Sequence, residues 1–243
     1  MPNPKSSSIF HYTKTLDVLK SILRNGFWPK YSPEDVSWIF NDPSKVAFPM
    51  VCFCDIPLSR VEQHTKFYGE YGIGLTQTWA IQRGLSPITY ISHNSALKQE
   101  YRRFADYTNR HSEIEIESAF YSFMAYSKPF RGKMPRNGRD VVRSFYPECE
   151  WRHIPRIKRN HVDAFFYPNK FKDKSLVDQS EQALAEDYAL KFPANDVKFL
   201  IVKDENEIIE MYNFLKDKTD FTSDECKLLT SRITTLKDIH DNY

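Results

Sequence analysis

The chain has 243 residues, a length that suits one large domain with a sizeable core. Its 41% hydrophobic and 27% charged residues are typical of a globular protein and exclude a disordered one. The formal net charge of +2 excludes a strong overall field that would draw the protein onto nucleic acid, so any basic surface must be local.

Cysteine usage and hydropathy set further limits. The four cysteines are irregularly spaced, and the Cys-x-Cys at residues 52–54 has no second pair, which argues against a disulfide framework or a zinc site. The segment MPNPKSSS lacks the apolar stretch of a signal peptide, and no run of about 18 apolar residues follows. We therefore expect a cytoplasmic protein with reduced cysteines, no metal and no membrane association.

The first elements alternate between strand and helix. Residues 9–12 predict a short strand, followed by an amphipathic helix that ends at Gly26. The segment 27–45 contains three prolines and predicts a loop, whereas the apolar run at 46–57 predicts a buried strand. This order is typical of a mixed fold.

The following segments continue the pattern up to residue 155. Residues 58–69 predict a helix, and 71–92 predict a strand, a short helix and another strand. Residues 95–126 are largely helical in pattern, 128–143 read as a basic loop, and 144–155 predict a strand.

The C-terminal part contains one strand and two helices in this interpretation. Residues 196–202 predict a strand, 205–218 a helix and 223–239 a final polar helix. Short strands separated by short helices predict an α+β domain with a split, mainly antiparallel sheet and peripheral helices. We expect a single domain over residues 1–243, with 204–243 as a C-terminal helical segment.

The stretch FHYT places His11, Tyr12 and Thr13 side by side on a short strand before a helix. Three hydrogen-bonding side chains in a row exceed the needs of a core strand, so we interpret them as one wall of a ligand pocket. The alternative is that His11 is a structural histidine with satisfied hydrogen bonds.

A second candidate stretch is YPECEWRHIP. A period of two places Glu148, Glu150 and Arg152 on one face of a strand. Taken alone, this pattern also fits a strand whose charged face is solvated.

The motifs FHYT, CFCDIPLS, YGIGLTQTWAI, MAYSKPF and ECEWRHIP, within residues 10–155, resemble the abortive-infection family AbiGi. The later segment PANDVKFLIVKDENEIIEM extends this resemblance over most of the chain. Members of that family are described as antitoxins of phage-defence operons.

More distantly, the pattern is similar to DarT-like ADP-ribosyltransferases, which place an NAD cleft between the halves of a split antiparallel sheet. The resemblance implies NAD as a substrate, no metal, and catalysis by Glu150 with Tyr71 and His11. Glu148 competes with Glu150 for the acid role, and Arg60 is the nearest match to an arginine of that family. The implied NAD site comprises His11, Tyr12, Thr13, Arg60, Tyr68 and Tyr71.

This chemistry needs such residues because cleavage of the nicotinamide–ribose bond leaves an oxocarbenium-like ribose that a carboxylate stabilises. The Tyr71 ring would pack on nicotinamide, and Gly72 and Gly74 would let the backbone approach the dinucleotide. Alternatively, Tyr68 and Tyr71 are core rings at a turn that the glycines serve.

The basic segment 128–143 carries six Lys or Arg residues and one acidic residue. It is either a solvated loop or an arm that grips phosphate and stacks on bases. The expected nucleic-acid-binding residues are Lys128, Phe130, Arg131, Lys133, Arg136 and Arg139.

The leading hypothesis is an NAD-dependent ADP-ribosyltransferase that acts as a toxin or effector in phage defence. It would modify a base of RNA or DNA and would need a cognate antitoxin as a neutralising partner. The competing hypothesis is a non-catalytic antitoxin that keeps the fold and binds a partner toxin. A metal-dependent nuclease has little support, because no cluster of carboxylates and histidines has the required spacing.

Overall fold

The computed structural model describes residues 7–40, 45–111, 113–136, 139–158 and 162–242. Their contacts divide the chain into two compact units. The first unit comprises Met1–Trp28, Cys52–Leu85 and Ala189–Tyr243, and the second comprises Pro29–Val51 and Ser86–Tyr188. A single domain over residues 1–243 stays a prediction. Within the described chain, no helix is long and apolar enough to cross a membrane.

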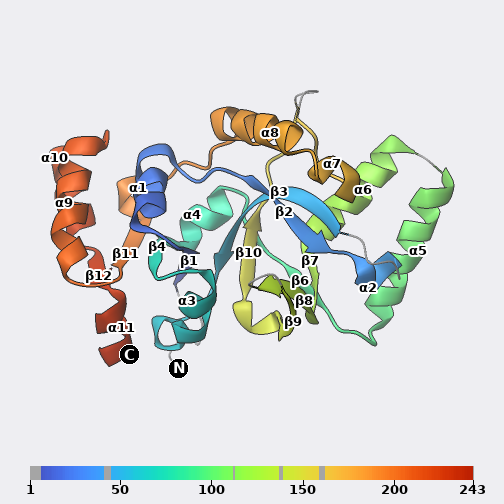
Figure 1. Cartoon of the computed structure of the whole chain (residues 1–243), viewed down its shortest axis with the longest axis horizontal. Helices are drawn as coiled ribbons and strands as arrows, with labels where there is room; N and C mark the ends of the chain where they lie inside the picture. Colours follow the sequence, from blue (N-terminus) through green and yellow to red (C-terminus); the bar gives the residue numbers. More distant parts are fainter. Residues whose placement is uncertain (1–6, 41–44, 112, 137–138, 159–161, 243) are drawn as a thin grey trace. The chain divides into compact units, whose positions relative to one another are not determined.

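The first unit is built around an antiparallel core of strands, with β12 added in parallel to β11 (Figure 1). The strands lie in the order β12-β11-β4-β1, and the C-terminal end of β3 pairs with β1. The elements are β1 (Ser8–Thr13), α1 (Leu16–Asn25), the 3₁₀ turn η1 (Leu58–Arg60), α3 (Glu62–Tyr68), β4 (Tyr71–Thr76), α4 (Gln77–Gln82), the 3₁₀ turn η3 (Ala194–Asp196), β11 (Val197–Val202), α9 (Asn206–Lys218), α10 (Ser223–Thr230), β12 (Ile233–Thr235) and α11 (Leu236–Asn242).

Helix α1 follows from its own sequence. The Thr15 side chain accepts a hydrogen bond from the Val18 amide and caps the N-terminus, and Gly26, with φ of 78°, ends the helix. Its buried residues recur at helical spacing and face the core: Leu19, Ile22 and Leu23.

The C-terminal segment differs from the predicted final helix at 223–239. Helix α10 ends at Thr230, and Ile233–Thr235 form β12, which pairs in parallel with β11 in the register Leu200↔Ile233. Two of these three residues are threonines and the third is isoleucine, all β-branched, so they suit a strand once β11 offers an open edge. The segment 204–243 is therefore helical with one strand inserted.

The second unit combines helices with short strand pairs (Figure 1). β2 pairs with β3, β5 with β10 and β8 with β9, all antiparallel, whereas β6 and β7 are parallel. The elements are β2 (Lys30–Asp35), α2 (Ser37–Phe40), β3 (Lys45–Cys54, whose last three residues belong to the first unit), β5 (Ser86–Pro87), β6 (Thr89–Ile91), α5 (Ala96–His111), α6 (Ile114–Ala125), β7 (Ser127–Pro129), β8 (Arg131–Arg136), β9 (Arg139–Ser144), the 3₁₀ turn η2 (Tyr146–Glu148), β10 (Glu150–His153), α7 (Pro168–Phe171) and α8 (Lys174–Asp187).

Two segments predicted as loops contain strands. Residues 30–35 form β2 despite Pro33, because β2 pairs with β3 alone among the described strands and its other edge needs no amide donor. The basic segment forms the hairpin β8–β9, in the register Lys133↔Val142. The chain is thus a mixed α+β protein whose strand pairs are mostly antiparallel, as the sequence predicts; an ADP-ribosyltransferase type of fold stays a prediction.

Candidate functional site

The candidate carboxylates lie where a 3₁₀ turn leads into a strand. Turn η2 ends at Glu148, Cys149 adopts a left-handed conformation with φ of 44°, and β10 begins at Glu150. Glu148 therefore precedes the strand instead of belonging to it. The side chains of Glu148, Glu150 and Arg152 are nevertheless all buried, with 3%, 7% and 0% of their surface exposed. The alternative of a solvated charged face is wrong.

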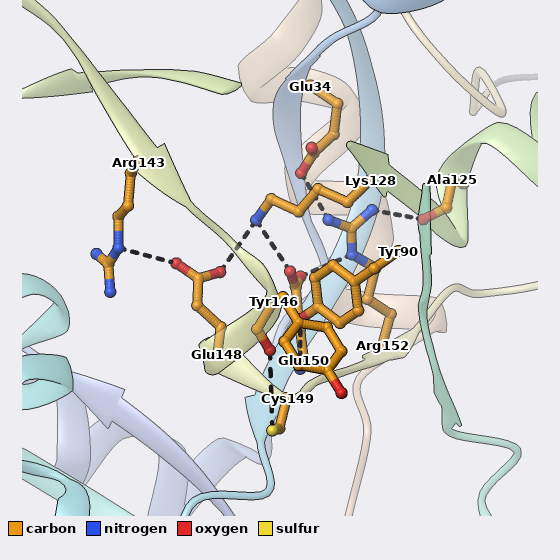
Figure 2. Close-up of polar contacts among 10 residues, drawn as sticks. All are labelled: Glu34, Tyr90, Ala125, Lys128, Arg143, Tyr146, Glu148, Cys149, Glu150 and Arg152. Atoms are coloured by element: carbon orange, nitrogen blue, oxygen red, sulfur yellow. Dashed lines mark hydrogen bonds and ion pairs between the residues drawn. The ribbon is translucent and has the colours of Figure 1, made fainter. Parts of the chain in front are cut away.

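Glu150 binds a cation through each of its carboxylate oxygens (Figure 2). Arg152 Nε donates to Oε1 at 2.7 Å, and Lys128 Nζ donates to Oε2 at 3.0 Å. The Tyr90 hydroxyl accepts a hydrogen bond from the Glu150 backbone amide at 2.9 Å. The side chain and backbone of Glu150 are thus held on three sides by the second unit.

The contacts extend to a second pair of carboxylates. Lys128 Nζ also donates to Glu148 Oε2 at 3.2 Å, and Arg143 Nε lies 3.5 Å from Glu148 Oε1. Arg152 Nη2 donates to Glu34 Oε1 at 2.8 Å. Figure 2 shows these side chains converging from β2, β7, β9, η2 and β10.

Three carboxylates therefore meet three cations in a buried region, and their formal charges cancel. We call the six residues the ion-pair network: Glu34, Lys128, Arg143, Glu148, Glu150 and Arg152. Arg152 also donates through Nη1 to the Ala125 carbonyl at 2.6 Å. Buried charges persist only when they are paired in this way, because desolvation of an unpaired ion is costly.

The network fixes the protonation state of its central residues. Burial alone would raise the pKa of Glu150, but the charges of Arg152 and Lys128 outweigh it and lower this pKa from 4.5 to about 2. Burial lowers the pKa of Lys128, yet the carboxylates of Glu150, Glu34 and Glu148 together raise it above its ordinary value. Glu150 is therefore a carboxylate at neutral pH and cannot donate a proton as a general acid.

The predicted NAD-binding residues belong to the first unit, and His11 is held there by its own neighbours. The Nδ1 atom of His11 lies 2.8 Å from the Cys52 carbonyl oxygen, and its ring packs at centroid distances of 5.2 Å and 5.6 Å from Phe27 and Phe53. Burial lowers the pKa of His11 below 6.5, and the bond to Cys52 only partly offsets this effect. His11 is therefore neutral at pH 7, as expected of a structural histidine.

Tyr12 and Thr13 point to different environments. Tyr12 is 7% exposed and lies in the core cluster of the first unit with Phe10, Cys54 and Ile201. Burial raises the pKa of the Tyr12 hydroxyl well above 10. Thr13 ends β1 and is paired in register with Tyr71 on β4, so the structure brings these two predicted site residues together.

Tyr71 also contacts the C-terminal helices of its unit. Its hydroxyl donates to Glu207 Oε1 at 2.7 Å, and burial together with the Glu207 carboxylate raises the pKa of Tyr71. Tyr68 packs against the core cluster with its ring centroid 4.4 Å from that of His64, and Arg60 is exposed at the end of η1. The Tyr68 ring and the Tyr71 hydroxyl thus have partners within the protein.

The glycines of YGIG leave space for aromatic rings. A Cβ at Gly74 would lie 2.6 Å from Cε1 of Phe10, and a Cβ at Gly72 would lie 2.9 Å from the Tyr12 ring. Neither position adopts a left-handed backbone. Both glycines lie within β4 and approach the core of the first unit, so they serve packing in a strand and not the turn of the alternative interpretation.

The predicted catalytic set divides between the units. His11 and Tyr71 belong to the first unit and Glu150 to the second. A shared site around one NAD therefore stays a prediction.

The predicted nucleic-acid-binding residues are not equivalent. Lys128 is buried in the ion-pair network, with its Nζ atom 4.4 Å from the centroid of the Phe145 ring, so it is not a phosphate-gripping side chain on an open arm. Phe130 is exposed and stacks on Tyr146 at 4.8 Å. Arg131, Lys133 and Arg139 are exposed on the β8–β9 hairpin, whereas the Arg136 side chain lies outside the described residues.

Sequence reasoning missed several members of the network. Glu34 was hidden because its segment reads as a proline-rich loop, and Arg143 because it falls in the basic run. Tyr90, which lies on β6 outside the network and accepts from the Glu150 amide, carries no motif at all. The sequence contains one signal of this network, the Glu-x-Glu-x-Arg spacing. This spacing predicts that the three side chains share a face of a strand, but it does not predict their partners.

The comparison with protein families decides the family. A family model described as "Putative abortive phage resistance protein AbiGi, antitoxin" matches residues 25–203. The chain belongs to the AbiGi family. It is also 24% identical over 250 residues to the abortive phage resistance protein AbiGi of Lactococcus lactis subsp. cremoris, covering 89% of this chain and 99% of the relative. No solved structure matches the chain.

Proposed function

We propose that this AbiGi-family protein is the antitoxin of a phage-defence toxin–antitoxin pair and that it acts by binding its partner toxin. The family description names an antitoxin, and the Lactococcus relative, matched over nearly its full length, is named as an abortive phage resistance protein. Both support a role in abortive infection. The antitoxin role is the competing hypothesis of the sequence analysis, which these descriptions favour over the toxin.

The observation that best supports a non-catalytic role is that both carboxylate oxygens of Glu150 bind cations of the protein itself. ADP-ribosyl transfer needs a carboxylate that faces the ribose and develops its interaction in the transition state. Glu150 is 7% exposed and already binds Arg152 and Lys128 at 2.7 Å and 3.0 Å. A carboxylate whose charge is compensated within the protein stabilises a developing cation less than a carboxylate left open to substrate.

ADP-ribosyl transfer from NAD by Glu150, His11 and Tyr71 is the competing prediction, and it can be tested together with the antitoxin role. The products of the genes that flank the gene of this protein would be expressed as candidate toxins, each with and without the full chain. We expect the wild-type protein to restore growth against one of these products and to co-purify with that partner. Labelled NAD incubated with the protein and RNA, DNA or lysate should give no labelled acceptor.

Two variants distinguish the antitoxin role from ADP-ribosyl transfer. Glu150→Gln removes the charge that transfer chemistry requires, and the matched Glu100→Gln variant changes a carboxylate that is 59% exposed on α5. Where thermal unfolding shows both variants folded, we expect both to neutralise the toxin. Label transfer by the wild type that Glu150→Gln abolishes would overturn the proposal in favour of the transferase, as would growth arrest caused by this protein alone.

A further inference from the structure

A cavity of about 830 Å³ lies within the second unit, and none of its described lining residues belongs to the ion-pair network. It is lined by the end of β2 and α2, the start of β3, the start of α5 and the β8–β9 hairpin. This volume falls in the range of about 300–1,000 Å³ that is typical of small-molecule sites. The cavity is therefore large enough for a ligand of nucleotide size.

The lining of this cavity is strongly basic. The cationic side chains come from three separate segments, whereas Asp35 is the one carboxylate among the described lining residues. Oδ1 of Asp35 accepts a hydrogen bond from the Ser37 amide at 2.9 Å, so this carboxylate is partly engaged locally. The basic lining residues are Lys45, His93, Lys98, Arg102, Arg131 and Lys133.

Among the described residues, the Lys98 side chain has no carboxylate partner. Its side chain is buried, with 8% exposed, and its Nζ atom lies 3.4 Å from Nδ1 of His93. Burial and the nearby charge of Arg102 lower the pKa of Lys98. A buried lysine is ordinarily compensated by a carboxylate, whereas the described contact of the Lys98 ammonium is a histidine and the nearby charge of Arg102 has the same sign. A bound anion would supply the missing compensation.

Two further features point to the kind of anion. Helix α5, 16 residues long, begins at Ala96, and the three residues before it line the cavity: His93, Asn94 and Ser95. The N-terminus of a helix favours phosphate because of its free amides and dipole. Trp38, on α2, lines the same cavity and packs on Tyr101 at a centroid distance of 5.5 Å, so an aromatic ring stands beside the cations.

We propose that this cavity binds a nucleotide, with its phosphates against Lys98, Arg102 and Arg131 and its base against Trp38. Phosphates next to a flat base occur in free nucleotides and in single-stranded nucleic acid, and the experiment distinguishes these two sources. This inference does not depend on toxin neutralisation.

Binding can be measured by calorimetry on the full chain with ATP, NAD, a short single-stranded RNA, a short single-stranded DNA and inorganic pyrophosphate. We expect at least one nucleotide ligand to bind more tightly than pyrophosphate, with an affinity that falls as salt rises. If the RNA or DNA oligonucleotide binds more tightly than ATP and NAD, the ligand of the cavity is single-stranded nucleic acid. If ATP or NAD binds more tightly, the ligand is a free nucleotide. Absence of binding by all five ligands would overturn the proposal.

Cavity variants locate the binding. Lys98→Met removes the charge and keeps most of the apolar volume of the side chain. Arg131 is exposed, so Arg131→Gln should leave the fold intact. Each should weaken nucleotide binding about tenfold or more, the loss expected for a hydrogen bond to a charged group. Arg103→Gln is the matched control, because Arg103 neighbours Arg102 on α5 but is 74% exposed and pairs with Glu100.

Trp38→Leu tests the base contact, because it should weaken binding of the nucleotide about tenfold while leaving pyrophosphate affinity unchanged. Nucleotide binding that is equal in the wild type, Lys98→Met and Arg131→Gln would place the ligand elsewhere and overturn the assignment. Toxin neutralisation is scored separately, so failure of nucleotide binding is not confused with failure of the antitoxin role.

Discussion

Arg152 and Glu34 form an ion pair of 2.8 Å although 118 positions separate them in the sequence, and the Arg152 side chain has no exposed surface. The pair joins β10 to β2 within the second unit. Because Arg152 also binds Glu150 and the Ala125 carbonyl, it connects three elements that are distant in the sequence. A charge at this position acts as a structural support.

Removal of the Arg152 charge should destabilise the protein strongly. Arg152→Met leaves Glu34 without its cation and Glu150 with Lys128 alone, and breaking a buried pair costs about 3–5 kcal/mol of unfolding free energy. The measurement is urea unfolding of the full chain at pH 7. Arg103→Met, in a pair that is mostly exposed, should cost less than about 1 kcal/mol. Equal losses in the two variants would show that the network contributes no more than a surface pair.

Stability should fall at acidic pH in a way that depends on Glu150. The pKa of Glu150 is about 2 in the folded state against an ordinary 4.5, so the unfolded chain takes up a proton first as pH falls. The Glu150 carboxylate makes its full contribution to the unfolding free energy above pH 4.5, and this contribution is lost as pH falls from 4.5 toward 2. Its size is roughly 3 kcal/mol.

The measurement is the unfolding free energy at several pH values between 7 and 3, for the wild type and Glu150→Gln. The variant has no carboxyl at this position, so its stability should change less over this interval. Parallel pH profiles of the two proteins would contradict the assigned pKa.

Gly74→Ala should destabilise the first unit through the Phe10 ring. The added Cβ would lie 2.6 Å from Cε1 of Phe10, and overpacking of this kind costs about 1–3 kcal/mol. A double-mutant cycle with Phe10→Leu measures the coupling, and the double variant should lose less stability than the sum of the single variants. Additive losses would show that Gly74 is required for a reason other than the ring.

Local sequence patterns were sufficient to predict much of the fold. The amphipathic pattern of α1 and its end at Gly26 depend on neighbours a few residues away, and both occur as predicted. Strands β3 and β11 are apolar runs, and β1 and β4 contain short apolar stretches that are buried. The α+β class follows from their alternation with helices.

The missed strands depend on partners that are distant in the sequence. β2 contains Pro33 and becomes a strand because β3 offers an edge, and β12 forms because β11 is open beside it. The β8–β9 hairpin carried a local signal that the basic composition obscured, because Asn137 and Gly138 are a pair that favours hairpin turns.

In the candidate site, too, features that depend on neighbours in the sequence could be predicted, whereas contacts with distant elements could not. Spacing predicts that Glu150 and Arg152 share a face, and the structure confirms it. Spacing cannot predict that Lys128 reaches them, because a lysine in a basic run is usually solvated. Whether a charged face is buried is decided by the opposing elements.

The two units are interleaved along the polypeptide, since the first takes both ends of the chain and residues 52–85, and the second takes the two stretches in between. Truncation from either terminus therefore removes part of the first unit before it reaches the second. We therefore do not expect serial deletion to map the proposed toxin-binding region, because shortened chains should lose folding together with binding. Point substitutions on the intact polypeptide are the appropriate way to locate the contact surface.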